Sequence, residues 1–547
     1  MASQQQPGTI PPDQLIVATS EAIRGGNNEG AAALADRALA FGLRHPVLYN
    51  ARALALQQKG QFREALAEFN HARALAPRDA RISNAIGVCL LNLNQPMEAL
   101  KAFEQAIASD PSYAQPYFRK GWILEMLGDR DEARKFYETT VKIDPNHAEA
   151  LGSLASAEAT AGRNEEAQSF AERALKIDPS QPTAVVALGI VDLANRNYAA
   201  AESRLRSVID SAQLTLRTQA IVTGLVADAL DGQGRYAEAF ACYRYENNEK
   251  RKLYAQSYTG ETRPPVVVGR IAAFVNASPA ESWMAKASSD RSESRVRTHA
   301  FLVGFSRSGT TLLEQVLASH SDIVALEEQD LLAAAAQDLL ASDAGMRKLV
   351  ALTEDECEAM RSDYWRRIRD RGLDVADKVF VDKLPLNTIK LPLIARLFPK
   401  AKIIFALRDP RDVILSCYRR HFAINTAMFE FLTLDDAVEF YDAVMTLGVA
   451  CREKLPLETH LHRYEDMVAD FDNSIAAVCD FVGVEPSPAM REFQHTRGLG
   501  VRSPSAAQIR RPLNEDSVGV WRHYRENLAP VLPFLRPWAE RFGYAAD

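Results

Sequence analysis

The sequence predicts an α-helical solenoid over the first half of the chain and an α/β domain with a central parallel sheet over the second. Prolines recur at one constant interval in the first half, at Pro77, Pro111, Pro145 and Pro179. In the second half, apolar strand-like runs are followed by tight turns and helical patterns. The length of 547 residues also exceeds what one hydrophobic core supports, so more than one domain is expected.

Small residues keep the same interval as the prolines, at Ala65, Ala99, Ala133, Ala167 and Ala201. Two crossing helices need small side chains where they touch, and proline cannot continue a helix. The pattern resembles the tetratricopeptide repeat, whose period is about 34 residues, with about six units, the outer ones degenerate. The resemblance implies a groove that binds a peptide or protein, while a packing scaffold for the second half or a homodimer interface stays open.

The periodicity predicts where the domains lie. It ends near Tyr254, and the segment that follows is rich in serine, proline and charge, which is typical of a connection. We therefore expect a repeat array over residues 1–253, a linker over 254–296 and a second domain over 297–547.

The composition excludes several classes of protein. A net charge of −7 argues against non-specific nucleic-acid binding. The six cysteines are scattered, which argues against a disulfide framework or a zinc site and favours a reducing compartment. Neither a signal peptide nor an apolar run of ~18 residues is visible, so a cytoplasmic protein without a membrane span is expected.

A strand-turn-helix pattern in the second half predicts an anion site. Thr298–Phe305 is a buried-strand pattern, and the turn after it points backbone N–H groups and a helix N-terminus at a ligand. Gly304 and Gly309 have the spacing of the nucleotide-hydrolase loop, but Thr310 stands where that loop has its lysine. A loop without this lysine suits a nucleotide that has no γ-phosphate, and it carries Arg307 instead.

The string FSRSGTTLLEQVLASH resembles the 5′-phosphosulfate-binding loop of sulfotransferases, with Ser306 in place of the usual proline. The resemblance implies that five consecutive residues bind the 5′ end of the donor: Arg307, Ser308, Gly309, Thr310 and Thr311.

A second segment resembles the 3′-phosphate site of the same family. Arg408 ends the apolar strand Ile403–Leu407, and Ser416 follows on the helical pattern after it. Arginine can bind phosphate through two parallel hydrogen bonds, and open α/β sheets bind ligands at the carboxyl ends of their strands. Together the two segments imply that the co-substrate is 3′-phosphoadenosine 5′-phosphosulfate and that no metal is required.

The resemblance also implies the catalytic groups. The offset from Arg307 to Glu328 is similar to that of the base in protein-tyrosine sulfotransferases, and Glu327 is the alternative base. A carboxylate in this place could accept a hydroxyl proton if burial raises its pKa. Lys383 resembles the lysine that stabilises the bridging oxygen between phosphate and sulfur, a role that Arg307 can share.

Two C-terminal segments complete the resemblance. Tyr464 matches an aromatic residue that helps to bind adenine, and Ser505 matches a serine that closes over the donor. Val520 stands before Trp521, where the family has lysine or arginine. Three basic residues are candidates to replace that contact: Arg510, Arg511 and Arg522.

The combination resembles bacterial fusions of tetratricopeptide repeats with a sulfotransferase domain that is similar to protein-tyrosine sulfotransferases. An enzyme that uses this donor is therefore expected. The acceptor stays open between tyrosine, a saccharide or lipid hydroxyl and a small phenol, because Gln329 and Asp330 stand where an acceptor-selecting arginine is expected. The alternatives are a nucleotide kinase or hydrolase, and a non-enzymatic adaptor with a degenerate nucleotide site.

Overall fold

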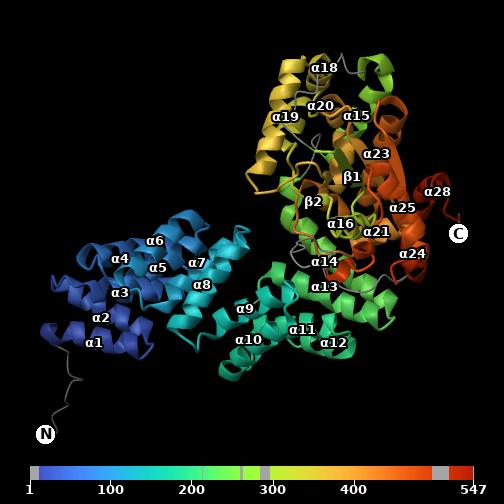
Figure 1. Ribbon diagram of the computed structural model, residues 1–547. Helices are drawn as coiled ribbons and strands as arrows, with labels where there is room; N and C mark the ends of the chain where they lie inside the picture. The colour runs from blue at the N-terminus through green and yellow to red at the C-terminus, as the bar shows by residue number, and fades with distance from the viewer. Residues whose placement is uncertain (1–10, 212–213, 259–262, 284–295, 496–515, 546–547) are drawn as a thin grey trace, which may run out of the picture. The chain divides into compact units, whose positions relative to one another are not determined.

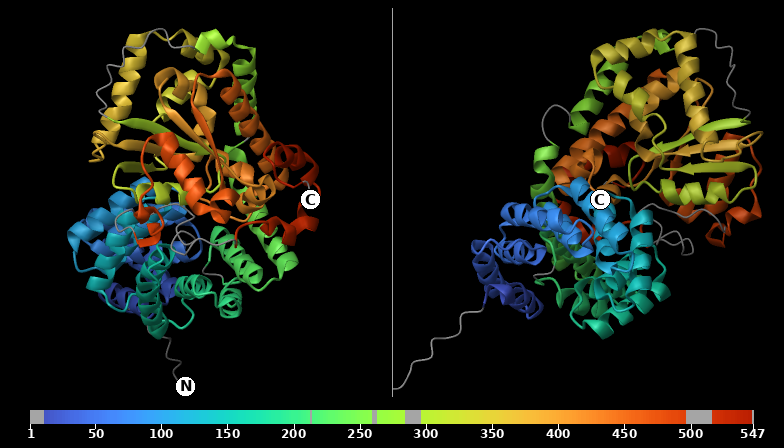
Figure 2. Two further views of the ribbon diagram at one scale, coloured as in Figure 1. Left: turned by 45° about the vertical axis from the view of Figure 1, so that its right-hand side comes forward. Right: turned by 90° about the vertical axis from the view of Figure 1, so that its left-hand side faces the viewer.

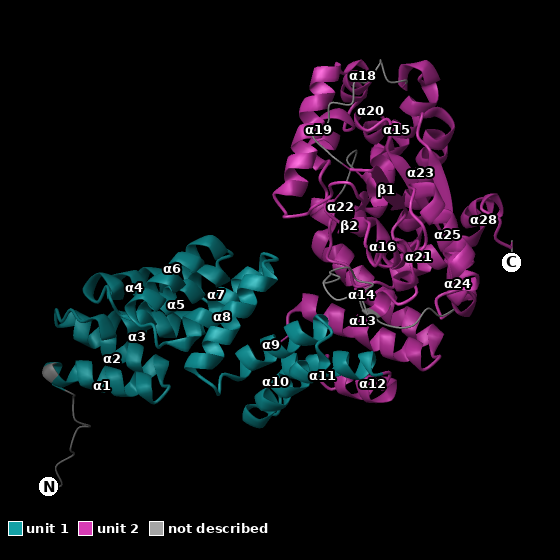
Figure 3. Cartoon of the chain, viewed as in Figure 1, with its two compact units in different colours: residues 1–195 teal, residues 196–547 magenta. Residues whose placement is uncertain are grey.

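The computed structural model describes residues 11–211, 214–258, 263–283, 296–495 and 516–545 (Figure 1). The chain forms two compact units, Met1–Asn195 and Arg196–Asp547 (Figure 3). The boundary between them lies inside the region where the sequence predicts the repeat array.

The first unit consists of helix pairs that follow the period of the sequence. The repeated alanines are buried where the helices of a pair meet, and a Cβ at Gly87 would lie 2.5 Å from the ring of Phe103. Each repeated proline follows the second helix of a pair, which confirms the predicted solenoid. The helices are α1 Pro12–Arg24, α2 Asn28–Ala40, α3 Pro46–Gln58, α4 Phe62–Leu75, α5 Ala80–Asn92, α6 Pro96–Ser109, α7 Ala114–Met126, α8 Arg130–Ile143, α9 Ala148–Thr160, α10 Asn164–Ile177 and α11 Pro182–Ala194.

The second unit begins with helices that precede its sheet. The helices α13 and α14 pack against each other, and α15 packs against the long helix α23 although it lies where the sequence predicts a linker. The elements of this part are α12 Tyr198–Arg206, α13 Leu216–Gly232, α14 Tyr236–Tyr254, η1 Ala255–Ser257, α15 Pro264–Ala277 and η2 Ala280–Trp283.

The described residues of the second unit form a five-stranded sheet in the order β2-β3-β1-β4-β5. All neighbouring strands are parallel, which confirms the predicted parallel sheet. The strands lie side by side among helices (Figure 2). Their bounds are β1 Thr298–Gly304, β2 Ile323–Glu327, β3 Val379–Lys383, β4 Lys402–Leu407 and β5 Thr459–Arg463.

Helices cover both faces of this sheet. Leu313 of α16 and Val478 of α25 belong to the apolar cluster on one face, whereas Tyr364 of α19 contacts His299 on the other. The remaining elements are α16 Thr310–Ala318, α17 Ala333–Leu339, α18 Asp343–Ala351, α19 Glu354–Arg369, η3 Pro385–Lys390, α20 Leu391–Leu397, α21 Pro410–Tyr418, α22 Thr426–Phe429, η4 Glu430–Leu432, α23 Leu434–Lys454, α24 Tyr464–Ala469, α25 Phe471–Val482, η5 Pro488–Met490, η6 Phe493–His495, η7 Val520–Tyr524, α27 Arg525–Leu528 and α28 Leu532–Arg541.

All six cysteines lie among the described residues, and each is a free thiol. Within the described ranges, no helix combines the length and the apolar character that crossing a membrane requires.

Candidate active site

The loop between β1 and α16 depends on two glycines. Gly304 has a φ of 155°, and a Cβ there would lie 2.5 Å from the carbonyl oxygen of Ala406 in β4. Gly309 has a φ of 85°, and a Cβ there would lie 2.6 Å from Cδ2 of Tyr464. Because the N-cap residue of α16 is this glycine, no side chain caps the first turn, and its backbone N–H groups can bind an anion.

The two predicted phosphate sites meet at this loop. The Nε of Arg307 donates to Oγ of Ser416 at 3.0 Å, and Nη1 of Arg408 donates to the carbonyl oxygen of Arg307 at 3.1 Å. The guanidinium of Arg408 also lies 5.0 Å from the ring centre of Tyr464. The other residues expected at the 5′ end are buried in the loop and the first turn of α16: Ser308, Thr310 and Thr311.

Three guanidinium groups make this region electropositive. Burial and the nearby charges of Arg420 and Arg408 lower the pKa of Arg307, because each of them disfavours its charged form. The Nε of Arg408 is buried and has no hydrogen-bond partner among the described residues. A buried N–H group without an acceptor costs free energy of folding, unless a bound ligand accepts its hydrogen bond. The charges and the unsatisfied donor therefore fit a ligand with several negative charges.

A second cluster surrounds Lys383 at the end of β3. Its Nζ lies 3.0 Å from Oε2 of Glu314 and 2.9 Å from Oε1 of Glu328, and Oε1 of Glu327 is 3.9 Å away. Lys383 is 0% exposed and Glu314 only 1%. Because three carboxylates share one lysine, the cluster has an excess of negative charge.

Burial and pairing act in opposite directions on this cluster. Burial raises the pKa of Glu314 to about 7, despite the opposing charge of Lys383. Burial also opposes the charged form of Lys383, but the carboxylates of Glu314 and Glu328 outweigh it and raise the pKa of the lysine. The ammonium group is therefore retained at neutral pH, while Glu314 exchanges its proton near neutrality.

Glu328 differs from Glu314 in exposure and in backbone conformation. Its side chain is 38% exposed, so it can reach a substrate from solvent while it contacts Lys383. Its φ of 44° is unusual for a residue other than glycine. The backbone N–H of Glu328 donates to the carbonyl oxygen of Lys383 at 2.8 Å, which stabilises this conformation just after β2. Such backbone strain is common at functional sites.

Comparison with known protein families finds matches in both halves of the chain. Residues 300–488 match the model of a family described as the sulfotransferase family. Residues 50–114, 90–148, 118–182 and 158–225 match models of the tetratricopeptide repeat. The chain joins tetratricopeptide repeats to a sulfotransferase-family domain.

Several curated proteins are similar to somewhat less than half of the chain. The protein-tyrosine sulfotransferase 2 of Gallus gallus is 24% identical over 267 residues, which are 45% of this chain and 68% of that protein. A putative protein-tyrosine sulfotransferase of Caenorhabditis briggsae is 24% identical over 252 residues, 45% of this chain and 88% of that protein. A protein of Aquifex aeolicus (strain VF5) is 25% identical over 248 residues, and there the match spans 43% of this chain and 32% of its relative.

Solved structures match parts of the chain at low TM-scores. MamA is 21% identical with a TM-score of 0.26, and the match covers 29% of this chain and 94% of MamA. PilW, described as a type IV pilus biogenesis factor, is 21% identical with a TM-score of 0.32, and the match covers 38% of this chain and 96% of PilW.

The C-terminal part of the predicted site is described only in part. Ser505, like Arg510 and Arg511, lies outside the described residues. Val520 begins η7, and Arg522 is exposed. The adjoining segment nevertheless reaches the loop, because the carbonyl oxygen of Ser517 accepts from Nη2 of Arg408 at 2.5 Å.

Sequence reasoning missed Glu314 and Arg420. Glu314 is an acidic residue inside the otherwise apolar segment TLLEQVLA, a pattern that signals a buried charge with a partner. Arg420 follows α21 within the run YRRHF, where nothing in the sequence separates it from exposed basic residues. Both become recognisable only when the sheet order brings β1 beside β3 and β4.

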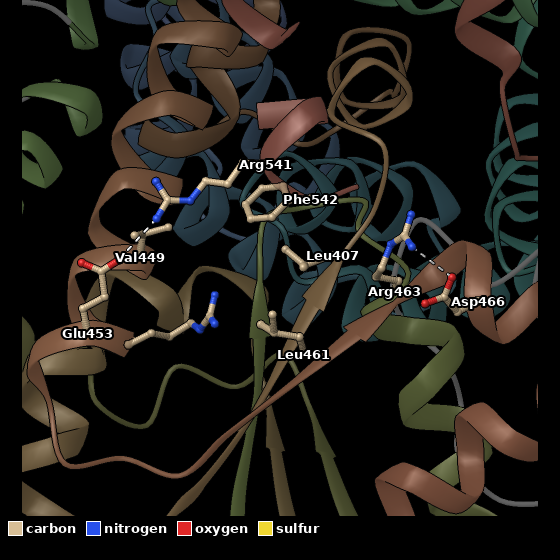
Figure 4. A pocket seen from close by; sticks show the side chains of 9 residues that line it. Leu407, Val449, Glu453, Leu461, Arg463, Asp466, Arg541 and Phe542 are labelled. Carbon is tan, nitrogen blue, oxygen red and sulfur yellow. Dashed lines mark hydrogen bonds and ion pairs between the residues drawn. The ribbon is translucent and has the colours of Figure 1, made fainter. Parts of the chain in front are cut away.

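A cavity of about 390 Å³ lies beyond the ends of β4 and β5 (Figure 4). Its charged lining includes two ion pairs, Arg463 with Asp466 at 3.3 Å and Arg541 with Glu453 at 3.3 Å. The other lining residues are Leu407, Val449, Arg452, Leu461 and Phe542. None of the residues predicted to bind the donor or to act in catalysis lines this cavity, so it is separate from the candidate site.

Proposed function

We propose that this chain transfers a sulfuryl group from 3′-phosphoadenosine 5′-phosphosulfate to the hydroxyl group of an acceptor. The observation that carries the proposal is that Arg307 forms hydrogen bonds with both Arg408 and Ser416. The latter two lie 101 and 109 positions further along the chain, respectively. These residues were expected at opposite ends of one doubly phosphorylated nucleotide, and they lie within hydrogen-bond distance of one another.

Binding of the donor is assigned to groups that favour negative charge. The end of the loop and the start of α16, from Ser308 to Thr311, would bind the 5′ end, and Arg408 with Ser416 would bind the 3′-phosphate. Tyr464 would contact the adenine, with the position of its ring fixed by Gly309 and Arg408. Ser505 remains a predicted contact.

The proton of the acceptor hydroxyl is assigned to Glu328, whose exposed carboxylate can meet an incoming substrate. When bound, the donor supplies the sulfuryl group and leaves with negative charge on its bridging oxygen. Lys383 and Arg307 provide the positive charge that stabilises this oxygen. Once Glu328 accepts the proton, its attraction for Lys383 falls, and Glu314 keeps the ammonium group in place.

The acceptor we propose is a tyrosine in a protein or peptide, bound by the repeat array or brought by a partner that binds there. Similarity to protein-tyrosine sulfotransferases supports this choice over a saccharide, a lipid or a small phenol. The proposal concerns the second half of the chain most directly, because the sulfotransferase family model matches residues 300–488 and the repeat models match only residues before 226.

Labelling tests the proposal. The full chain is incubated with donor that carries radioactive sulfur and with a bacterial lysate, and we expect label in protein, on tyrosine, from which acid hydrolysis releases it as sulfate. Label in lipid, saccharide or small molecules would overturn the choice of acceptor. If the chain neither transferred label nor bound the donor, the proposal that it is a sulfotransferase would be overturned.

The base is tested by Glu328→Ala, with Glu327→Ala as the comparison. We expect the first variant to lose turnover while its affinity for adenosine 3′,5′-bisphosphate stays within about threefold of wild type, because the carboxylate acts on the acceptor and not on the donor. If Glu328→Ala remained fully active while Glu327→Ala lost turnover, the alternative base would be correct.

A further inference from the structure

The helix pair α13–α14 carries two buried charges of opposite sign. Glu246 is 2% exposed and Lys250 is 5% exposed, and their side chains lie 2.6 Å apart. Buried ionic groups are costly unless they are paired, so their partners indicate what this surface contacts. Besides Lys250, Glu246 has a partner from the segment that directly follows α21.

His421 lies between two carboxylates of the helix pair. Its Nε2 is 3.0 Å from Oδ2 of Asp228 and its Nδ1 is 2.9 Å from Oε1 of Glu246. The Nδ2 of Asn247 donates to the carbonyl oxygen of Tyr418 at 2.9 Å. Both contacts fix the end of α21 against α14, within the second unit.

A second set of contacts joins the same helix pair to η7. Asp231 of α13 pairs with Arg419 and accepts a hydrogen bond from the hydroxyl of Tyr524. The guanidinium of Arg419 lies between two aromatic rings, 5.4 Å from the centre of Tyr243 and 5.1 Å from that of Tyr524. One carboxylate therefore links α13 to both the α21 end and η7.

Both of these segments reach the loop that we assign to the donor. Ser416, in the last turn of α21, accepts from Arg307. The segment before η7 contacts Arg408 through the carbonyl oxygen of Ser517, and the backbone N–H groups of Gly519 and Trp521 donate to Asp412 of α21. A shift of either segment would move the hydrogen-bond partners of the two arginines.

We propose that α13–α14 is a positioning element of the donor site, and that Asp231 is its principal positioning residue. The helix pair follows the repeat pattern in sequence, but its charged face fixes α21 and η7 in place of binding a peptide. This inference rests on the proposed function, because it assumes that Arg307, Arg408 and Ser416 bind the donor. The new element is that the affinity for the donor depends on residues of α13–α14 that do not contact the donor.

The test uses the full chain with Asp231→Asn, and with Glu238→Gln as the matched control. Glu238 lies on α14 and pairs with Arg235. Its side chain is exposed, and this ion pair does not involve α21 or η7. We expect Asp231→Asn to weaken the affinity for adenosine 3′,5′-bisphosphate about tenfold or more, as loss of a charged hydrogen bond does. The KM for the donor should rise in parallel, while kcat at saturating donor and the control variant stay within about twofold of wild type.

A second variant covers the case in which Asp231→Asn does not fold. Tyr524→Phe removes only the hydroxyl that donates to Asp231, and we expect it to weaken the affinity for the bisphosphate about three- to tenfold. Wild-type affinity in a folded Asp231→Asn or, failing that, in Tyr524→Phe would overturn the inference. A fall in kcat with unchanged donor KM would also overturn it. If the wild-type chain itself did not bind the bisphosphate, the proposed function would fail instead.

Discussion

Replacing Lys383 by methionine removes the positive charge from the centre of the glutamate cluster. Methionine retains much of the apolar stem, so the change isolates the ammonium group that lies 3.0 Å from Glu314 and 2.9 Å from Glu328. Glu314 would then be a buried carboxyl group with no cation beside it. Breaking a buried pair by removing one partner costs about 3–5 kcal/mol, unless the remaining group becomes neutral.

The pH dependence of this loss follows from the pKa of Glu314. Burial places that pKa at about 7, above the ordinary value of 4.5, so the folded wild-type chain retains a proton that the unfolded chain releases. The stability that this carboxyl contributes is complete below its unfolded pKa and declines until the pH reaches about 7. Without Lys383 the folded pKa rises further, so the decline continues above pH 7 at about 1.4 kcal/mol per pH unit.

Denaturant unfolding at about pH 6 and about pH 9 measures the effect. Four of the five tryptophans lie in the second unit, so their fluorescence reports mainly on its unfolding. We expect the loss of stability in Lys383→Met to be larger by roughly 2–3 kcal/mol at the higher pH. The double variant Glu314→Gln with Lys383→Met has no charge at either of these buried positions, so its loss of stability relative to wild type should not grow with pH but shrink by about 1.4 kcal/mol, because only wild type still carries the titrating carboxyl. An equal loss at both pH values in the single variant would refute the reasoning.

Two further predictions concern the loop. Arg408→Ala should weaken the affinity for adenosine 3′,5′-bisphosphate by ~1.5–3 kcal/mol, with partial recovery in Arg408→Lys, as measured by calorimetry; unchanged affinity in Arg408→Ala would remove this residue from the donor site. Gly309→Ala should destabilise the second unit in two ways. The positive φ at this position should cost about 1–2 kcal/mol, and the contact of the new Cβ with Tyr464 should cost a further ~1–3 kcal/mol. The control is Gly372→Ala, which has a φ of 71° and no atom within 4 Å of its Cβ, and it should show only the first of these losses; equal losses in the two variants would contradict the proposed crowding.

The local parts of the fold were predictable because their signals lie within short stretches of sequence. The constant interval between prolines and between alanines specifies the helix pairs, since each pair buries its small residues at a crossing that lies within one period. The turn at Gly304–Gly309 is likewise specified by residues that tolerate positive φ. Apart from Ser505, which lies outside the described residues, the residues assigned to the donor by resemblance lie on or beside this turn.

The remaining features depend on contacts between distant segments. Glu314 and Lys383 lie far apart in the sequence, and only the pairing of β1 with β3 brings their elements together. The helix pair α13–α14 continues the repeat pattern in sequence, yet its half-buried carboxylates Asp231 and Asp228 pair with Arg419 and His421 just after α21. Composition and periodicity do not encode such partners, because an ion pair leaves no regular spacing along the chain.

The central claim is that the loop, Arg408 and Ser416 form one binding site for a nucleotide with phosphate at both ends. Calorimetric titration of the full chain with adenosine 3′,5′-bisphosphate, in the presence of a chelator of magnesium, tests it most directly. We expect one molecule bound per chain, with affinity at least about tenfold higher than for adenosine 5′-monophosphate, because the 3′-phosphate contacts Arg408 and Ser416. Equal affinity for the two nucleotides, or binding only when magnesium is added, would contradict the account.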